Sequence, residues 1–145
     1  MSDPAGYSGT PLAQKLGLKD GSRALFIDLP ADLAGLATSR AFVEASRIPA
    51  NQLDKAQPGY DVIHLFTTAR SVLEALAQKL MTLIARDGMI WVSWPKQAAK
   101  ADTDITEDVI RAVALPLGLV DIKVCAVNVI WSGLKLMIRK ELREA

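Results

Sequence analysis

The sequence predicts one α/β domain with a mostly parallel, doubly wound sheet between two helical layers, a three-layer α/β/α arrangement. Its 145 residues are 50% apolar and carry a formal net charge of only +1, which is typical of a core-rich globular domain. Short apolar runs alternate with longer amphipathic segments, and this order favours parallel strands joined by crossover helices. The single cysteine, Cys125, lies in an apolar run and is expected to be a core hydrophobe in a reducing compartment.

The first half of the chain contains one clear strand. Residues 23–29 form a continuous apolar run that ends at Pro30, which is expected of a strand buried on both faces of a parallel sheet. Glycine and proline are frequent before it, so residues 1–22 are predicted to be an N-terminal arm. The other expected elements of this half are short helices at 11–16 and 30–36, a short strand at 41–46 and a loop at 48–60.

The second half has a stronger periodicity. Ser71 with Glu74, and Asp104 with Glu107, match the capping box that begins many helices. The last two strands are separated by a tight turn near 128–133, so they must pair antiparallel. The domain is therefore a Rossmann-like domain over 23–139, closed by a C-terminal hairpin and followed by a charged tail at 140–145. The elements expected here are strands at 61–67, 89–94, 119–127 and 131–139 and helices at 71–86 and 104–115.

Two resemblances accompany this layout. From Asp61 on, an acidic-led strand, a helix, the strand Met89–Trp94 after Asp87-Gly88, a helix and a terminal hairpin resemble the second half of a class I S-adenosylmethionine-dependent methyltransferase. The segments Ile90–Lys96 and Trp131–Leu136 carry a resemblance to a bacterial family known only as a domain of unknown function. The first resemblance implies a fold, and the second implies a small Rossmann-like domain without an assigned activity.

The methyltransferase interpretation meets three departures in the sequence. The segment after Asp28 lacks the glycine-rich turn that lets a backbone approach the cofactor. Glu44 is the only candidate for the acidic residue that contacts the cofactor's ribose at the end of the second strand. The middle of the chain is also about one strand–helix unit short of a full methyltransferase sheet. We therefore expect no cofactor, with S-adenosylmethionine disfavoured, and the sequence favours a protein that is not an enzyme.

A small anion site is the preferred functional prediction. Ligands of doubly wound sheets bind beyond the carboxyl ends of the strands, which places a site after residues 28, 67 and 94. A helix N-terminus at Arg70 and a nearby lysine would attract an anion there, and Trp94 offers a ring for stacking. The residues predicted to bind are Thr67, Thr68, Arg70, Ser93, Trp94 and Lys96. The competing interpretation is that Trp94 packs the strand exit while Arg70 and Lys96 are solvated.

Other chemistry is disfavoured by the residues present. His64, the single histidine, lies in mid-strand and is expected to be a hydrogen-bonded core residue and not a general base. The acidic residues at 102–108 are explained better by helix capping than by a metal, so no metal and no catalytic residue is assigned. Near-zero charge argues against nucleic-acid binding, and the absence of a long apolar segment or a signal sequence predicts a cytoplasmic protein without a membrane partner.

Three functions follow, in order of preference. The first is a non-catalytic module that binds a small anionic or nucleotide-like ligand, or a protein partner, at residues 67–70 and 93–96. The alternative is a degenerate methyltransferase-like enzyme that uses S-adenosylmethionine. The third is an interaction protein that forms a homodimer through the edge of the terminal hairpin, because an unpaired edge strand invites pairing.

Overall fold

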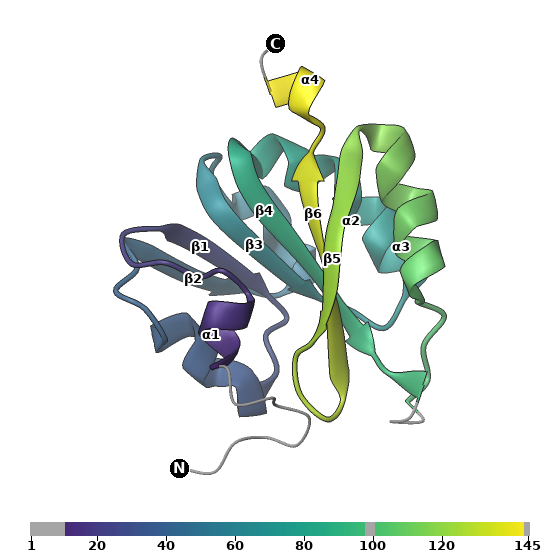
Figure 1. Ribbon diagram of the computed structural model, residues 1–145, viewed down its shortest axis with the longest axis horizontal. Coiled ribbons are helices and arrows are strands. Elements are labelled where there is room, and N and C mark those ends of the chain that lie inside the picture. Colours follow the sequence, from purple (N-terminus) through teal and green to yellow (C-terminus); the bar gives the residue numbers. More distant parts are fainter. Residues whose placement is uncertain (1–10, 98–100, 144–145) are drawn as a thin grey trace.

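The centre of the protein is a six-stranded sheet with the order β2-β1-β3-β4-β6-β5 (Figure 1). The computed structural model describes residues 11–97 and 101–143. Strands β1 to β4 run parallel, whereas β6 pairs antiparallel with both β4 and β5. The predicted Rossmann-like sheet with a C-terminal antiparallel hairpin is confirmed. Its strands are β1 (Arg23–Ile27), β2 (Glu44–Ile48), β3 (Tyr60–Phe66), β4 (Ile84–Pro95), β5 (Leu119–Ala126) and β6 (Trp131–Ile138).

Helical segments cover both faces of this sheet. Residues of α1 and η1 pack on one face, and residues of η2, α2 and α3 pack on the other. Figure 1 shows α2 behind the right-hand strands and α3 to the right of β5. The short helix expected near residues 11–16 and the one expected after Pro30 are both present. The segments are α1 (Leu12–Lys15), η1 (Ala31–Thr38), η2 (Ala50–Lys55), α2 (Arg70–Leu83), α3 (Glu107–Ala114), η4 (Leu115–Leu117) and α4 (Lys140–Arg143), of which the η segments are 3₁₀-helices.

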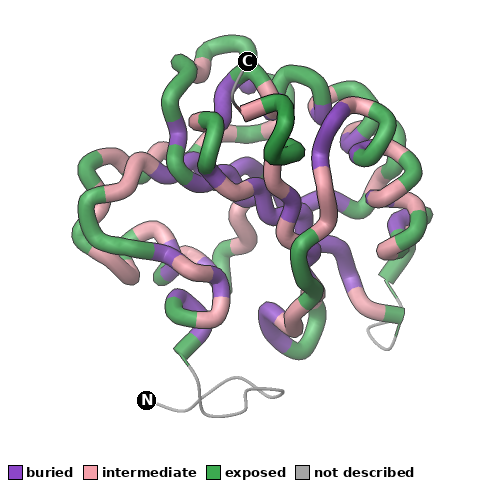
Figure 2. The backbone as a smooth tube through the Cα atoms, turned by 45° about the horizontal axis from the view of Figure 1, so that its top comes forward, coloured by how far each residue is buried: buried purple, intermediate pink, exposed green. Residues whose placement is uncertain are grey.

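Two apolar cores lie on opposite sides of the sheet because side chains alternate along each strand. In β1, Leu25 and Ile27 enter the core under α2 and α3, whereas Ala24 and Phe26 enter the core under α1 and η1. Figure 2 shows the buried residues concentrated along the central strands. Leu16, which follows α1, is fully buried and its carbonyl accepts a hydrogen bond of 2.9 Å from Trp91 Nε1. The segment before β1 is thus packed into the core under α1 and η1.

Some element boundaries differ from the predicted ones in the first half of the chain. The strand expected at 41–46 begins and ends later, as β2, because only from Glu44 on does the chain run in register with β1. The loop expected at 48–60 contains η2, where Leu53 is buried against the core under α2. A single buried leucine gives no periodic signal, so this turn of helix was not predictable from the pattern.

The boundary between α2 and β4 also differs. The helix ends at Leu83 rather than Arg86, and residues from Ile84 on are already extended. The pairing of β3 and β4 shifts register between Tyr60 and Val62, so β4 bulges around Gly88. A Cβ atom at Gly88 would lie 2.8 Å from Ile84 Cγ1 and 2.9 Å from the Asp61 carbonyl oxygen. Gly88 therefore permits a close approach of two strands, in the place where the sequence predicted a helix stop.

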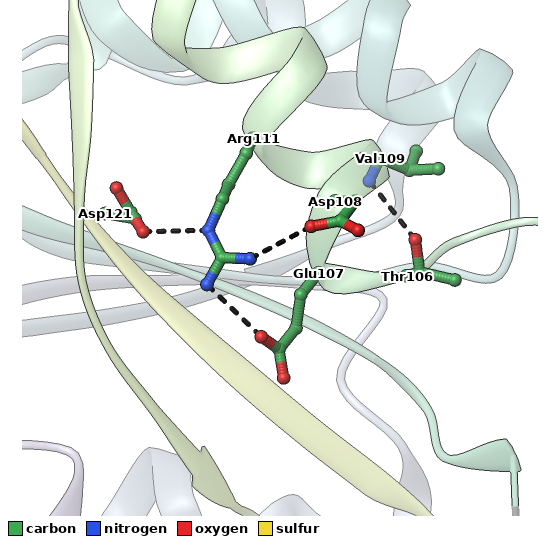
Figure 3. Close-up of polar contacts among 6 residues, drawn as sticks. All are labelled: Thr106, Glu107, Asp108, Val109, Arg111 and Asp121. Carbon is green, nitrogen blue, oxygen red and sulfur yellow. Dashed lines mark hydrogen bonds and ion pairs between the residues drawn. The ribbon is translucent and has the colours of Figure 1, made fainter.

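An ion-pair cluster attaches α3 to the edge strand β5 (Figure 3). The guanidinium of Arg111 donates to Asp121 at 2.8 Å, and to Glu107 and Asp108 at 3.2 Å each. The hydrogen bond from Arg111 lowers the pKa of Asp121 below its ordinary value. The side chain of Thr106 accepts from the amide of Val109 and caps α3. The predicted cap, Asp104, is therefore wrong for this helix.

Replacing Gly88 with alanine is expected to destabilise the protein. The added methyl group meets backbone and a buried isoleucine, and overpacking of this kind lowers the free energy of unfolding by about 1–3 kcal/mol. Gly35→Ala is the matched control, because nothing lies within 4 Å of a Cβ atom at Gly35. Urea unfolding of both variants checks this, and equal stabilities for the two would contradict the close approach.

Candidate functional site

The carboxyl ends of the four parallel strands form one edge of the sheet. The strand order reverses at β1, which has β2 on one side and β3 on the other. Loops that leave a sheet on either side of such a point form a crevice, and ligands of doubly wound sheets bind there. The residues that follow the strands at this edge are Asp28, Pro49, Thr67 and Lys96.

The predicted anion-binding residues are only partly exposed at this edge. Thr67 and Ser93 are buried, and their backbones pair through Thr67 N and Ser93 O at 3.1 Å. The side chain of Ser93 contacts His64 within the sheet, and Trp94 is 7% exposed in the core under α2 and α3. Trp94 also lines a pocket of about 360 Å³ with Pro95 and residues near the start of α3.

The N-terminus of α2 already holds a carboxylate of the same chain. Asp104 Oδ1 accepts a hydrogen bond of 2.7 Å from the Arg70 amide, and Thr103 Oγ1 donates to the Thr68 carbonyl at 2.7 Å. The Arg70 guanidinium donates to Glu74 at 3.0 Å. Asp104 thus caps α2 from a distant loop, which explains why the predicted capping box of Ser71 and Glu74 is wrong: neither residue caps the helix.

Lys96 holds the tip of the β5–β6 hairpin over the same edge. Its amide donates to the Ile130 carbonyl at 2.7 Å, and its Nζ donates to the Asn128 carbonyl at 2.6 Å. The buried Asn128 accepts from the amides of Ile130 and Trp131 and donates to Asp32 at 3.3 Å. Asn128 is therefore the residue that connects the hairpin to η1, and the sequence showed only a turn there.

Glu44 lies at the wrong end of its strand for the predicted ribose contact. It begins β2 at the amino edge, next to Arg23 at the start of β1. Its carboxylate accepts hydrogen bonds from Ser46 Oγ at 2.6 Å, Tyr60 OH at 3.0 Å and Arg23 Nε at 3.1 Å. These hydrogen bonds, the one from Ser46 foremost, lower the pKa of Glu44. The expectation that Glu44 lies at the carboxyl end of the second strand is wrong, because β2 begins at Glu44.

A pocket of about 220 Å³ lies at the carboxyl corner of β1 and β2. Asp28 has a φ of 55°, so the chain turns through the left-handed region directly after β1. Its amide donates to the Ile48 carbonyl at 3.0 Å, and its Oδ1 accepts from the Ala50 amide at 3.3 Å. The residues that line the pocket are Asp28, Leu29, Arg47, Ile48 and Pro49.

His64 is fully buried on β3. Its Nε2 lies 2.7 Å from Ser93 Oγ, and its ring stacks on Phe66 with centroids 4.1 Å apart. Nδ1 has no hydrogen-bond partner among the described residues, so the expectation of a hydrogen-bonded core histidine holds for only one ring nitrogen. Burial lowers the pKa of His64 to about 3, which keeps the ring neutral at physiological pH.

Gly133 occupies a position in the sheet where a side chain would be crowded by its neighbours. It lies within β6, paired with Ser93 on β4 and Cys125 on β5. A Cβ atom there would lie 3.1 Å from Ser93 Oγ and 3.2 Å from a Trp91 ring carbon. The small residue makes room for the pair formed by Ser93 and His64.

The remaining chemical groups do not extend the site. Within residues 11–97 and 101–143, no group of three or more histidine, cysteine, aspartate or glutamate side chains is placed to hold a metal ion. Cys125 is half-buried, and desolvation raises the pKa of its thiol. The described part of the chain also contains no helix with the length and apolar character that crossing a membrane requires.

The fold is that of known methyltransferases. An S-adenosylmethionine-dependent methyltransferase from Aquifex aeolicus matches with a TM-score of 0.62 at 14% identity, covering 88% of this chain and 87% of that one. Magnesium protoporphyrin IX methyltransferase from Synechocystis PCC 6803, with bound S-adenosylmethionine, gives 0.60 at 14% identity over 89% and 74%. A TehB-like methyltransferase from Corynebacterium glutamicum gives 0.56 at 13% identity over 93% and 91%. Identities this low establish the fold alone.

These neighbours correct the expectation of no cofactor and change the order of preference among the expected functions. We expected no cofactor, yet the Synechocystis enzyme carries S-adenosylmethionine in one structure and S-adenosylhomocysteine in another of the same fold. That expectation is wrong, because neighbours of this fold bind S-adenosyl compounds and the three departures do not prevent the chain from taking the fold. At the level of the fold, the methyltransferase-like alternative is favoured over the non-catalytic binding module. No protein-family model and no curated protein matches the chain.

Replacing Asp104 with alanine is expected to weaken the start of α2. Loss of a capping carboxylate lowers the free energy of unfolding by about 1 kcal/mol. Asp102→Ala is the control, because Asp102 is an exposed acidic residue of the same loop. Chemical denaturation of the two variants tests this, and a stability loss in the control equal to that of Asp104→Ala would contradict the capping role.

His64 is expected to make the protein less stable in mild acid. The folded state keeps the ring neutral down to about pH 3, whereas the unfolded chain protonates it near 6.5. Its contribution is therefore fully present above pH 6.5 and is lost as the pH falls toward 3, by about 2 kcal/mol between pH 6.5 and 4.5. Unfolding free energies of wild type and His64→Leu across that range test this, since the variant should show a shallower decline. Parallel pH profiles would refute it.

Proposed function

We propose that this chain is an S-adenosylmethionine-dependent, methyltransferase-like protein that binds an S-adenosyl compound at the carboxyl edge of β1 and β2. The fold-level similarity to several methyltransferases supports this. The observation that carries it is the pocket of about 220 Å³ beside the point where the strand order reverses.

The turn after β1 shows that a glycine is not required for the chain to turn sharply there. A glycine-rich turn was missing, and glycine is the residue that most readily adopts a positive φ. Asp28 takes this conformation itself, with a φ of 55°, so the chain still turns sharply at the end of β1. Aspartate is one of the few side chains that tolerate the left-handed region.

The residues around the pocket suit the adenosyl part of such a ligand. Asp28 is the one acidic residue in the lining, and its carboxylate can accept hydrogen bonds from ribose hydroxyls. Leu29, Ile48 and Pro49 offer apolar walls for a purine ring. When bound, S-adenosylmethionine would supply an electrophilic methyl group, while Asp28 and the apolar walls orient the nucleoside and exclude water from it.

Two further predictions remain proposals. The anion site at Thr67–Arg70 and Lys96 would have to compete with Asp104 for the amide of Arg70. The homodimer would use β5, which ends the strand order and exposes Ile122 by 46% and Val124 by 40%. The resemblance to the bacterial family of unknown function likewise stays a prediction.

Replacing Asp28 with asparagine is expected to weaken binding of S-adenosylhomocysteine. Asparagine keeps the side-chain oxygen for the Ala50 amide and tolerates the positive φ, but it lacks the charge that strengthens hydrogen bonds from ribose hydroxyls. We expect an affinity loss of about tenfold or more, measured by isothermal titration calorimetry.

Glu44→Gln is the control, because Glu44 lies at the opposite edge of the same sheet. Its affinity for S-adenosylhomocysteine should stay within about twofold of wild type. Equal losses in the two variants, or no heat of binding in the wild type, would overturn the proposed site.

A further inference from the structure

Three lysines converge on the face of the sheet that α1 covers in part. Lys123 on β5 lies directly opposite Lys135 on β6, so both side chains leave the same face. Lys135 is also the register neighbour of Trp91, whose ring is hydrogen-bonded to the end of α1 on that face. Lys19 follows α1 and lines one pocket together with Lys135. These three residues are called the lysine cluster below.

The lysine cluster has no direct ion pair among the described residues, although Asp61 and Asp87 line the same pocket as Lys19 and Lys135. Across residues 11–97 and 101–143, none of the three side chains has an ion pair or a side-chain hydrogen bond. Like charges directly opposite each other destabilise a pair of strands. Burial lowers the pKa of the half-buried Lys135, and the charges of Lys123 and Lys19 lower it further. An anion placed among the three would relieve this repulsion.

The cluster borders a hollow of a size that suits a small molecule. The pocket shared by Lys19 and Lys135 has a volume of about 340 Å³, within the usual range for small-ligand sites. Figure 1 shows α2 behind β5 and β6, α3 to the right of β5, and no described helix in front of β5. The other residues that line the pocket are Gly17, Ser22, Asp61, Val62, Asp87, Gly88, Met89 and Met137.

The chemistry of the wall narrows the class of ligand. Asp61 and Asp87 place two carboxylates in the same pocket. These acids would repel a long polyanion such as RNA, whose binding requires many neutralised phosphates. They would instead accept hydrogen bonds from hydroxyl groups. A ligand that suits both the lysines and the two carboxylates therefore carries one anionic group and several hydroxyl groups.

We propose that Lys19, Lys123 and Lys135 bind the phosphate group of a small phosphorylated polyol, whose hydroxyl groups face Asp61 and Asp87. This site is distinct from the proposed adenosyl pocket. It lies beside the first residues of β1, β3 and the paired part of β4, whereas the adenosyl pocket lies beyond the last residues of β1 and β2.

Calorimetric titration with ribose 5-phosphate tests the proposal, with ribose as the uncharged probe. The wild type should bind ribose 5-phosphate and bind ribose at least about tenfold more weakly. Lys135→Met and Lys19→Met should each lower the affinity for ribose 5-phosphate by about tenfold, because each removes a charge-assisted contact while keeping an unbranched side chain. Lys79→Met is the matched control, since Lys79 is exposed on α2, on the other face of the sheet, and should change the affinity less than about twofold.

Several results would overturn the proposal. They are the absence of ribose 5-phosphate binding at about 10 mM, equal losses in Lys79→Met and Lys135→Met, and binding of a single-stranded RNA oligomer without binding of ribose 5-phosphate. Melting temperatures of the variants separate loss of binding from loss of folding. Titration with S-adenosylhomocysteine keeps the two sites apart: Lys135→Met should leave that affinity unchanged, and Asp28→Asn should leave the affinity for ribose 5-phosphate unchanged.

Discussion

Burial of the central strands on both faces is the constraint on which the rest of the structure depends. β1, β3 and β4 place apolar side chains alternately above and below the sheet, so each face must be covered. Helical segments cover both faces, and the loops that connect them to the strands leave at the two edges of the sheet. The candidate pockets therefore lie at the edges and beside the terminal hairpin, where the covering layers end.

The terminal hairpin gives the carboxyl edge its present shape. β6 pairs with β4, and the turn that precedes it is held by Lys96, Asn128 and Asp32. These contacts join η1 to the end of β4 across the middle of the sheet, next to the strands where the order reverses. Lys96 therefore holds the hairpin in place at this edge. Asp104 also has a structural role here, because its carboxylate accepts a hydrogen bond from the N-terminus of α2. The pocket at Asp28 lies to the side of these contacts, at the corner of β1 and β2.

Prediction succeeded where the signal was periodic along the chain. Six strands, the two longer helices and the antiparallel hairpin follow from apolar runs and turn residues that lie close together in sequence. The boundaries failed where a contact from elsewhere decides them. Gly88 approaches the Asp61 carbonyl of another strand, and Thr106, rather than Asp104, caps α3 because the loop carries Asp104 to α2. The position of Glu44 differs for the same kind of reason, since β2 starts three residues later than expected and therefore begins at Glu44, at the amino edge of the sheet.

The sequence by itself determined the class of fold, the order of its elements and the edge where a ligand is expected, because hydrophobic periodicity and turn chemistry are local properties. Only the tertiary structure decided which side chains reach that edge and which are already engaged. Arg70 and Lys96 were predicted to be available to an anion, but their partners, Glu74 and Asn128, are set by helix geometry and by packing of the hairpin. Asp28 and the lysine cluster are defined by a backbone angle and by strand register, and neither can be read from composition or spacing.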